Sequence, residues 1–267
     1  MADELGFGET LRLERLEADL FRGHCHAGSP QRAFGGQVAA QALVAAGGTV
    51  PDDRFVHSLH GYFIRGGRSD QPIVYSVDRV RDGRSFTTRR VVAVQDGKAI
   101  FGLSASFHGE ESGPTHQKPM PETVPPEDAE PAPDRWSAYA GSLEIRFNDV
   151  SSAADLPRRQ IWVRSRHPLG DDHLRNVCAL TYTSDIGLAG TAFLGRLNPR
   201  NPFQLSSLDH AVWFHRPFSL DDWLLFDTES PNYASTRGLA HGTFYTRSGT
   251  LVASVTQEVL IRPLPRD

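Results

Sequence analysis

The sequence predicts an α+β protein built from two similar halves, each with one helix followed by four antiparallel strands. Three observations predict this class. Each half has, near its start, a helical stretch rich in small residues; each stretch is followed by four runs with strand character; and the runs keep the same order and spacing in both halves. Because a single helix can cover one face of an antiparallel sheet, each half is expected to wrap its sheet around its helix.

The two helical stretches differ in polarity. The first, GGQVAAQALVAA at 35–46, is small and largely apolar, whereas the second, DDHLRNVCALTYTSDI at 171–186, ends near Asp185. That carboxylate is the only formal charge in the stretch 177–195, which we interpret as a buried helix with its continuation. Removing an unpaired carboxylate from water costs several kcal/mol. The Asp185 carboxylate must therefore be exposed to water, hydrogen-bonded to donors within the protein, or part of a functional site.

The strand predictions follow each helix in order. They cover 54–65, 71–80, 85–95 and 99–107 in the first half, and 206–218, 222–230, 238–247 and 250–261 in the second. Two hairpin-turn signals, Asp96-Gly97 and Ser248-Gly249, lie 152 residues apart, and Arg65 and Arg216 lie 151 apart. The shared order and offset indicate an internal duplication.

A proline-rich segment separates the halves. Residues 109–135 contain seven prolines, several acids and almost no large apolar residue, so we expect a linker that forms no regular element and buries little. The sequence therefore predicts an N-terminal unit at 1–109, a linker at 110–135 and a C-terminal unit at 136–267.

Charge and cysteine usage limit the expected partners and compartment. A net charge of −4 and a pI near 6.3 provide no basic field, so neither nucleic acid nor membrane insertion is expected. Cys25 and Cys178 form no CxxC pair, which indicates a reducing compartment. Acids stand where a signal peptide would carry lysines, and the C-terminal Leu-Pro-Arg-Asp differs from the peroxisomal Ser-Lys-Leu signal. We expect a cytoplasmic protein.

Several long segments, in the right order, resemble a known family. They are HSLHGYFIRGG (57–67), RDGRSFTTRRVVAVQDGKAIF (81–101), DHAVWFHRPF (209–218) and VASVTQE (252–258), and they look like the type II acyl-CoA thioesterases. The resemblance covers nearly the whole chain outside the linker. It implies a double hotdog fold, in which two tandem units each wrap an antiparallel sheet around a central helix. The implied activity is hydrolysis of fatty acyl-CoA to free fatty acid and CoA.

The resemblance also implies three catalytic residues, all in the C-terminal unit. Asp185, in Tyr-Thr-Ser-Asp, matches the family aspartate on the second helix, and Gln257, in Val-Thr-Gln-Glu, matches the glutamine on the final strand. Ser207, two residues before Asp209, stands where the best-known relatives are expected to have threonine. The serine retains the hydroxyl but lacks the methyl group that restricts a threonine rotamer.

The chemistry of these residue types agrees with thioester hydrolysis. The leaving thiolate has a conjugate acid of pKa about 8.5 by analogy with cysteine, so a strong general acid is unnecessary. The reaction needs a held water and donors for the developing oxyanion. A carboxylate, a hydroxyl and a carboxamide can hold that water without a metal ion or a cofactor, and CoA enters only as part of the substrate.

Substrate-binding candidates lie in both halves. The amides of Gly35 and Gly36 are candidate oxyanion donors if they open a helix, and Arg216 is a candidate contact to a CoA phosphate. No acidic residue lies between positions 34 and 51, so we expect one active site per chain, with the first half contributing walls. We also expect a homo-oligomer, because hotdog proteins commonly associate through sheet edges.

The same residues allow other interpretations. Asp185, Ser207 and Gln257 each have a structural interpretation as hydrogen-bonded core or turn residues. A hotdog enoyl-CoA hydratase or dehydratase would use Asp209-His210 as an acid and base pair, although the expected Asp-x-Asn-Pro-x-x-His loop is absent. A non-catalytic acyl-CoA-binding sensor is the third function. No metal site is expected, because His24-Cys25-His26 and the HxxH at 57–60 match no zinc spacing well.

Overall fold

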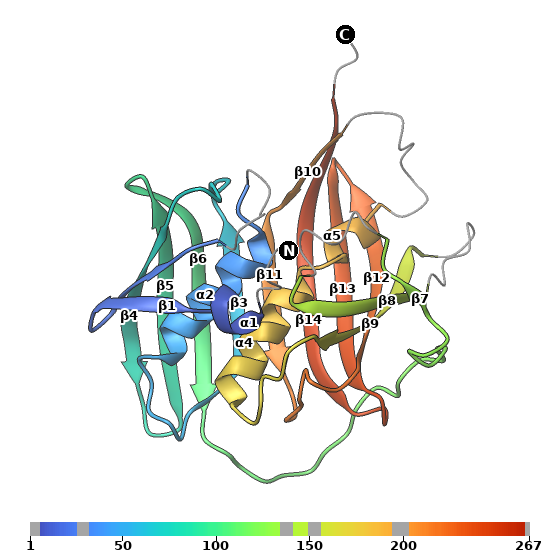
Figure 1. Cartoon of the computed structure of the whole chain (residues 1–267), viewed down its shortest axis with the longest axis horizontal. Coiled ribbons are helices and arrows are strands. Elements are labelled where there is room, and N and C mark those ends of the chain that lie inside the picture. The colour runs from blue at the N-terminus through green and yellow to red at the C-terminus, as the bar shows by residue number, and fades with distance from the viewer. Residues whose placement is uncertain (1–5, 26–31, 134–140, 149–155, 194–202, 265–267) are drawn as a thin grey trace.

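The computed structural model describes residues 6–25, 32–133, 141–148, 156–193 and 203–264, and its strands form one continuous antiparallel sheet (Figure 1). The elements of the first half are α1 (Phe7–Thr10), β1 (Leu13–Glu17), β2 (Leu20–Gly23), α2 (Gly35–Gly47), β3 (Phe55–Phe63), β4 (Ile73–Asp82), β5 (Phe86–Gln95) and β6 (Lys98–His108). Those that follow are β7 (Glu130–Pro131), β8 (Leu143–Asn148), β9 (Arg158–Ser165), α4 (His173–Ser184), α5 (Leu188–Thr191), β10 (Phe203–Ser207), β11 (Asp209–Phe214), β12 (Leu224–Ala234), β13 (Arg237–Thr246) and β14 (Leu251–Pro263).

The two halves repeat one strand order. Read outward from the central β3–β11 pair, the first half runs β3-β6-β5-β4-β2-β1 and the second runs β11-β14-β13-β12-β9-β8-β7, with β10 paired to β14. The predicted order of a helix and four antiparallel strands is confirmed in the first half. In the second half β11, β12, β13 and β14 follow that order, but the run 206–218 predicted as one strand is divided at Leu208 between β10 and β11. The central pair brings Leu59 opposite Val212, and both side chains are fully buried, so one core runs through both halves.

A hairpin before each helix was not predicted. In the first half, β1 has the sequence LERLE and is mostly exposed, so it carries no alternating apolar signal. In the second half, β9 is buried at nearly every position, and a short buried run of that kind has no strand periodicity either. These hairpins, β1–β2 and β8–β9, extend the sheet at its two ends.

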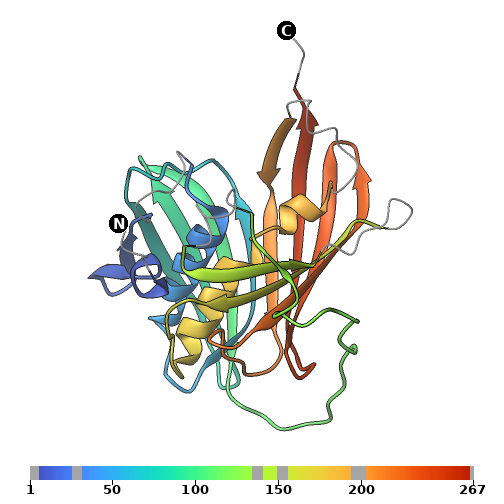
Figure 2. The same ribbon diagram turned by 45° about the vertical axis from the view of Figure 1, so that its right-hand side comes forward.

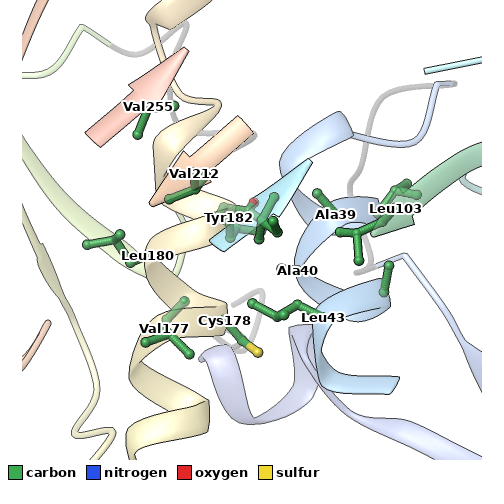
Figure 3. Close-up of a cluster of buried hydrophobic side chains, with 14 of the residues drawn as sticks. Ala39, Ala40, Leu43, Leu103, Val177, Cys178, Leu180, Tyr182, Val212 and Val255 are labelled. Atoms are coloured by element: carbon green, nitrogen blue, oxygen red, sulfur yellow. The ribbon is translucent and has the colours of Figure 1, made fainter. Parts of the chain in front are cut away.

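The helices α2 and α4 pack against each other in antiparallel directions, within the curve of the sheet (Figure 2). Ala40 and Leu43 of α2 lie beside Cys178 and Tyr182 of α4 (Figure 3). Small residues are needed at this interface because the backbones approach closely. A Cβ atom on Gly36 would lie 2.5 Å from the Tyr182 carbonyl oxygen. The N-terminus of α2 therefore meets the C-terminus of α4.

The connecting segment passes around one end of both halves (Figures 1 and 2). Its backbone carbonyls accept hydrogen bonds from buried side chains: Trp162 Nε1 donates to the Val124 oxygen at 2.8 Å and Gln160 Nε2 to the Glu122 oxygen at 3.0 Å. Ala129 is buried beside Trp162. Most of the segment is exposed, as predicted, and only Pro126 and Ala129 are buried within 109–133. The prediction that it forms no regular element is wrong, since it contributes the short strand β7. Prolines prevent a long ladder but leave carbonyl acceptors. The unit boundaries at 109–110 and 135–136 stay predictions.

His210 joins the second helix to the central strand β11. Its Nε2 lies 2.7 Å from Ser184 Oγ, which in turn donates to the Thr181 oxygen at 2.8 Å. Because the hydroxyl has only one proton, it accepts from His210 Nε2–H. Burial lowers the pKa of His210, while the carboxylates of Asp185 and Asp209 act in the opposite direction. The ring is thus held neutral within the core.

We expect the free energy of unfolding to decrease as pH falls below the ordinary histidine pKa of 6.5. A histidine whose pKa is lower in the folded chain binds fewer protons there than in the unfolded chain, so protonation favours unfolding in the window between the two values. The contribution of neutral His210 to the free energy of unfolding is fully present well above pH 6.5. As pH falls below 6.5, the loss for this one group is at most about 1.4 kcal/mol per pH unit. Urea unfolding at pH 7.5, 6.5 and 5.5, followed by tryptophan fluorescence, measures it.

The control for this dependence is His116→Gln, which alters an exposed histidine of the connecting segment and should leave the slope unchanged. His210→Gln should remove part of it, because burial also lowers the pKa values of His57, His173 and His215. If that variant does not fold, the nitrogen chemical shifts of the His210 ring in the unsubstituted protein provide the same test. A ring that titrates at pH 6.5 or above, or a free energy of unfolding that is flat from pH 7.5 to 5.5, would contradict the assignment.

Candidate active site

Asp185 lies at the C-terminus of α4, at the point where it meets the N-terminus of α2 in space. It is the C-cap residue of α4, and only 8% of it is exposed. Its Oδ2 accepts a hydrogen bond from the Gly36 N–H at 2.8 Å, and its Oδ1 accepts one from Gln257 Nε2 at 2.8 Å. The lone carboxylate of the second helix is therefore partnered, by the first half of the chain and by the final strand.

Asp185 acts as the N-terminal cap that α2 otherwise lacks. The N-cap residue Phe34 provides no side-chain acceptor. Gly36 is in the first turn of α2, where an N–H has no carbonyl partner within the helix. A carboxylate at the positive end of a helix is stabilised, whereas one at the negative end of its own helix is not. The approach of α2 is thus what stabilises a carboxylate at the end of α4.

Glycine is required at the start of α2 for this contact. A Cβ atom on Gly35 would lie 2.9 Å from Asp185 Oδ2 and equally close to the Phe63 ring. The helix begins at Gly35, as the oxyanion prediction required, but the Gly36 N–H is already donated to Asp185. The Gly35 N–H has no acceptor among the described residues, so of the two predicted donors only Gly35 has its N–H available.

Gln257 lies behind Asp185 on β14. Its side chain is fully buried and shares the core-facing side of the strand with Ala253, Val255, Val259 and Ile261, as the alternation predicts. The carboxylate can only accept, so the amide nitrogen must face it, and Oε1 takes no part in this hydrogen bond. That buried oxygen has no hydrogen-bond partner within the described part of the chain.

A cavity of about 450 Å³ opens beside the carboxylate. Asp185, Gly35 and Ser207 contribute to its lining. Both halves provide its apolar walls: Val38, Phe63, Ile64, Ile100, Phe101, Leu205, Leu208 and Leu260. Ser207 is the last residue of β10, and no hydrogen bond of its hydroxyl is found among the described residues. The structure thus brings Asp185, Ser207 and Gly35 to one cavity, with Gln257 in contact with Asp185.

Arg216 is not brought to this cavity. It follows β11 at the end remote from Asp209, where Nη1 donates to the Leu251 oxygen at 2.9 Å. Nη2 donates to Thr115 Oγ1 at 2.8 Å and to the His116 oxygen at 3.0 Å. Arg216 lines a different cavity, so the predicted CoA phosphate contact is not near Asp185.

The acid and base pair of the hydratase alternative is not assembled either. Asp209 Oδ1 accepts the Glu258 N–H at 2.6 Å, and His210 is buried against Ser184. Neither residue lines the cavity that holds Asp185. Both side chains are held by hydrogen bonds within the protein and away from the Asp185 cavity, so this arrangement does not favour the hydratase alternative.

Two arginines that the sequence analysis did not assign to the site do line it. They are Arg32 and Arg65. Arg65 was noted only as the counterpart of Arg216, and the duplication offset was the signal that could have identified it. Arg32 carries no such signal, because its placement depends on the fold.

The described ranges contain neither a metal-binding cluster nor a helix that could span a membrane. No three histidine, cysteine, aspartate or glutamate side chains gather there as a metal ion would require, and His26 lies outside those ranges. No helix in them combines the length and the apolar character needed to cross a membrane.

The chain is similar in sequence to known acyl-CoA thioesterases. A model described as acyl-CoA thioesterase matches residues 144–260, and one described as acyl-CoA thioesterase N-terminal domain matches 26–108. Acyl-coenzyme A thioesterase 8 of Mus musculus is 39% identical over 284 residues, which cover 96% of this chain and 89% of the mouse protein.

Solved structures similar to this chain indicate the same family and fold. The acyl-CoA thioesterase II TesB2 from Mycobacterium marinum superposes with a TM-score of 0.87 at 43% identity, covering 97% of this chain and 99% of its own. A protein of unknown function with a hot dog fold from Alicyclobacillus acidocaldarius superposes with a TM-score of 0.78 at 22% identity, covering 97% and 98%, and supports the fold alone. The chain therefore belongs to the type II acyl-CoA thioesterase family and has its double hotdog fold.

Proposed function

We propose that this enzyme hydrolyses fatty acyl-CoA to free fatty acid and CoA by direct attack of a water molecule held by Asp185, Ser207 and Gln257. As a member of its family it is a thioester hydrolase. The observation that carries the mechanism is the buried Asp185 carboxylate, fixed by two N–H donors beside a cavity with apolar walls. The proposed reaction uses no cofactor, because CoA is a part of the substrate and then a product.

Each of the three side chains has a distinct role in the proposal. Asp185 accepts the proton of the attacking water, for which its oxygens keep lone pairs beyond those used by Gly36 and Gln257. Ser207 donates its hydroxyl proton to the same water. Gln257 orients Asp185 through Nε2, and its buried Oε1, which has no partner among the described residues, accepts the second proton of the water. The remaining lone pair of the water faces the thioester carbon.

The carbonyl oxygen becomes negatively charged when the water attacks. In the proposal the Gly35 N–H, which is at the positive end of α2 and lines the cavity, donates to that oxyanion. The tetrahedral intermediate then breaks its carbon–sulfur bond, releases the CoA thiolate and leaves the carboxylic acid. The proton held by Asp185 is available for the thiolate, which restores the carboxylate.

We also propose that the enzyme is a cytoplasmic homo-oligomer. The described sheet has β1 at one edge and β7 and β8 at the other, where a second copy could pair. Cys25 and Cys178 are both free thiols, which agrees with a reducing compartment.

Replacing Asp185 by asparagine is expected to lower kcat/KM for acyl-CoA at least hundredfold, equivalent to about 2.7 kcal/mol of transition-state stabilisation. The amide is nearly isosteric but cannot take the proton of the water. Free-thiol release from a chain-length series of acyl-CoA esters at neutral pH measures the loss and identifies the preferred acyl group.

Asp209→Asn is the matched control, because the amide oxygen can still accept the Glu258 N–H and the side chain lies outside the cavity lining. It should retain activity within about threefold. An unsubstituted protein that binds acyl-CoA but releases no thiol would refute the hydrolase proposal in favour of the binding protein. An Asp185→Asn variant with full activity would refute the role of the carboxylate alone.

Replacing Ser207 by threonine should keep activity within about threefold, whereas Ser207→Ala should lose roughly tenfold in kcat, since one hydrogen bond to the held water is worth about 1–1.5 kcal/mol. The threonine retains the hydroxyl that the proposal requires. Steady-state kinetics of both variants on the preferred acyl-CoA provide the comparison, and equal activity of the serine and alanine proteins would remove Ser207 from the mechanism.

A further inference from the structure

The duplication places one arginine at the same point of each half. Arg65 follows β3 and its Nη1 donates to the Ala99 oxygen at 2.7 Å. Arg216 follows β11 and its Nη1 donates to the Leu251 oxygen at 2.9 Å. The two arginines are 151 residues apart and the two acceptors 152, so the guanidinium groups are anchored in equivalent ways.

The remaining donors of the two arginines differ. Arg216 Nη2 is engaged by Thr115 and His116 of the connecting segment. Arg65 is exposed, and beyond the Ala99 carbonyl its guanidinium group has no hydrogen-bond or ion-pair partner in the described part of the chain. A guanidinium carries five N–H donors. Arg65 therefore presents unused donors where Arg216 does not.

The charges around the two arginines also differ. Residues 63–67 line the cavity that holds Asp185, and residues 214–218 line the other cavity, of about 880 Å³. The other cavity is also lined by Glu110, Glu111 and Asp171, which would repel an anion. In the Asp185 cavity the charged lining groups are Asp185 itself, Arg32 and Arg65.

The backbone holds Arg32 against the segment that follows Arg65. The Ala33 N–H donates to the Gly67 oxygen at 2.9 Å, and Arg32 forms a β-bridge with Arg68. Arg68 is paired with Asp70 at 2.7 Å, whereas Arg32 has no ion-pair partner among the described residues. Two cations without a carboxylate partner thus lie at the lining of one cavity.

We propose that Arg65, assisted by Arg32, binds the phosphate groups of the CoA moiety at the mouth of the Asp185 cavity, and that Arg216 has no such role. The inference rests on the proposed function. Arginine matches phosphate oxygens with paired N–H donors. The pantetheine arm separates the phosphates from the thioester, so these contacts persist unchanged from bound substrate to transition state. Such uniform binding affects KM rather than kcat.

The test compares two thioesters of the same fatty acid: the acyl-CoA and the acyl-pantetheine, which has no phosphate. Arg65→Gln is expected to raise KM for the acyl-CoA about tenfold, with kcat within about twofold, and to leave kcat/KM for the acyl-pantetheine unchanged. Arg32→Gln should act in the same direction with a smaller effect, and Arg65→Lys should recover part of the loss.

Arg216→Gln is the matched control, because it removes the equivalent contact to a backbone carbonyl and should leave both KM values unchanged. The proposal is overturned if Arg65→Gln raises KM equally for both thioesters, or if Arg216→Gln raises KM for acyl-CoA as much as Arg65→Gln does.

Calorimetric binding of CoA and of pantetheine separates this proposal from the hydrolase mechanism, since it requires no turnover. A preference for CoA that Arg65→Gln reduces about tenfold supports the subsite even if no acyl-CoA is hydrolysed. Equal affinities for CoA in the unsubstituted and Arg65→Gln proteins overturn it even if hydrolysis is rapid. Should Arg65→Gln not fold, the same readouts on Arg32→Gln decide the question.

Discussion

The hydrogen bond from the Gly36 N–H to Asp185 Oδ2 is the contact on which the rest of the site depends. It joins two residues 149 positions apart and satisfies a helix N–H and a buried carboxylate at once. The contact is available only if two helices approach closely, which explains why 35–46 is rich in glycine and alanine. Any side chain on Gly35 or Gly36 would separate the helices. The fold requirement and the site requirement are therefore met by the same glycines.

The same contact explains why a duplicated scaffold has one such site. The N-terminus of α2 has no side-chain cap of its own and takes the distant Asp185. The N-terminus of α4 is capped locally, because Asp172 accepts the Arg175 N–H at 3.0 Å. The segment after α2, Gly48 and Thr49, offers no carboxylate to the equivalent position. The two helix ends thus differ in how their N–H groups are satisfied: α4 is capped by the residue that precedes it, whereas α2 is capped by a carboxylate from the other half of the chain.

The parts of the molecule that follow from local periodicity were predictable from the sequence, and those that depend on distant contacts were not. The near absence of charge in 177–195 was sufficient to predict a buried helix there, and the strand character of the later runs was sufficient to predict the strands that follow each helix. No local pattern could show that Asp185 reaches Gly36, since their contact depends on how the halves dock. Arg65 and Arg216 are equivalent in sequence, and what distinguishes them is a hydrogen-bonded segment elsewhere in the chain.

That segment determines more than the connection between the halves. Its Thr115 and His116 engage Arg216, its Gln117 donates to the Gly249 oxygen at 2.7 Å, and further along its carbonyls are held by buried side chains of β9. A proline-rich chain loses less conformational entropy when it is fixed in this way than an ordinary loop would. Its acidic residues at 110 and 111 add negative charge to the cavity around Arg216. The connecting segment therefore occupies the Nη2 donors of Arg216 and adds negative charge to its cavity, which makes that cavity unfavourable for phosphate. The equivalent residue Arg65, at the cavity of Asp185, keeps its remaining N–H donors available for an anionic substrate.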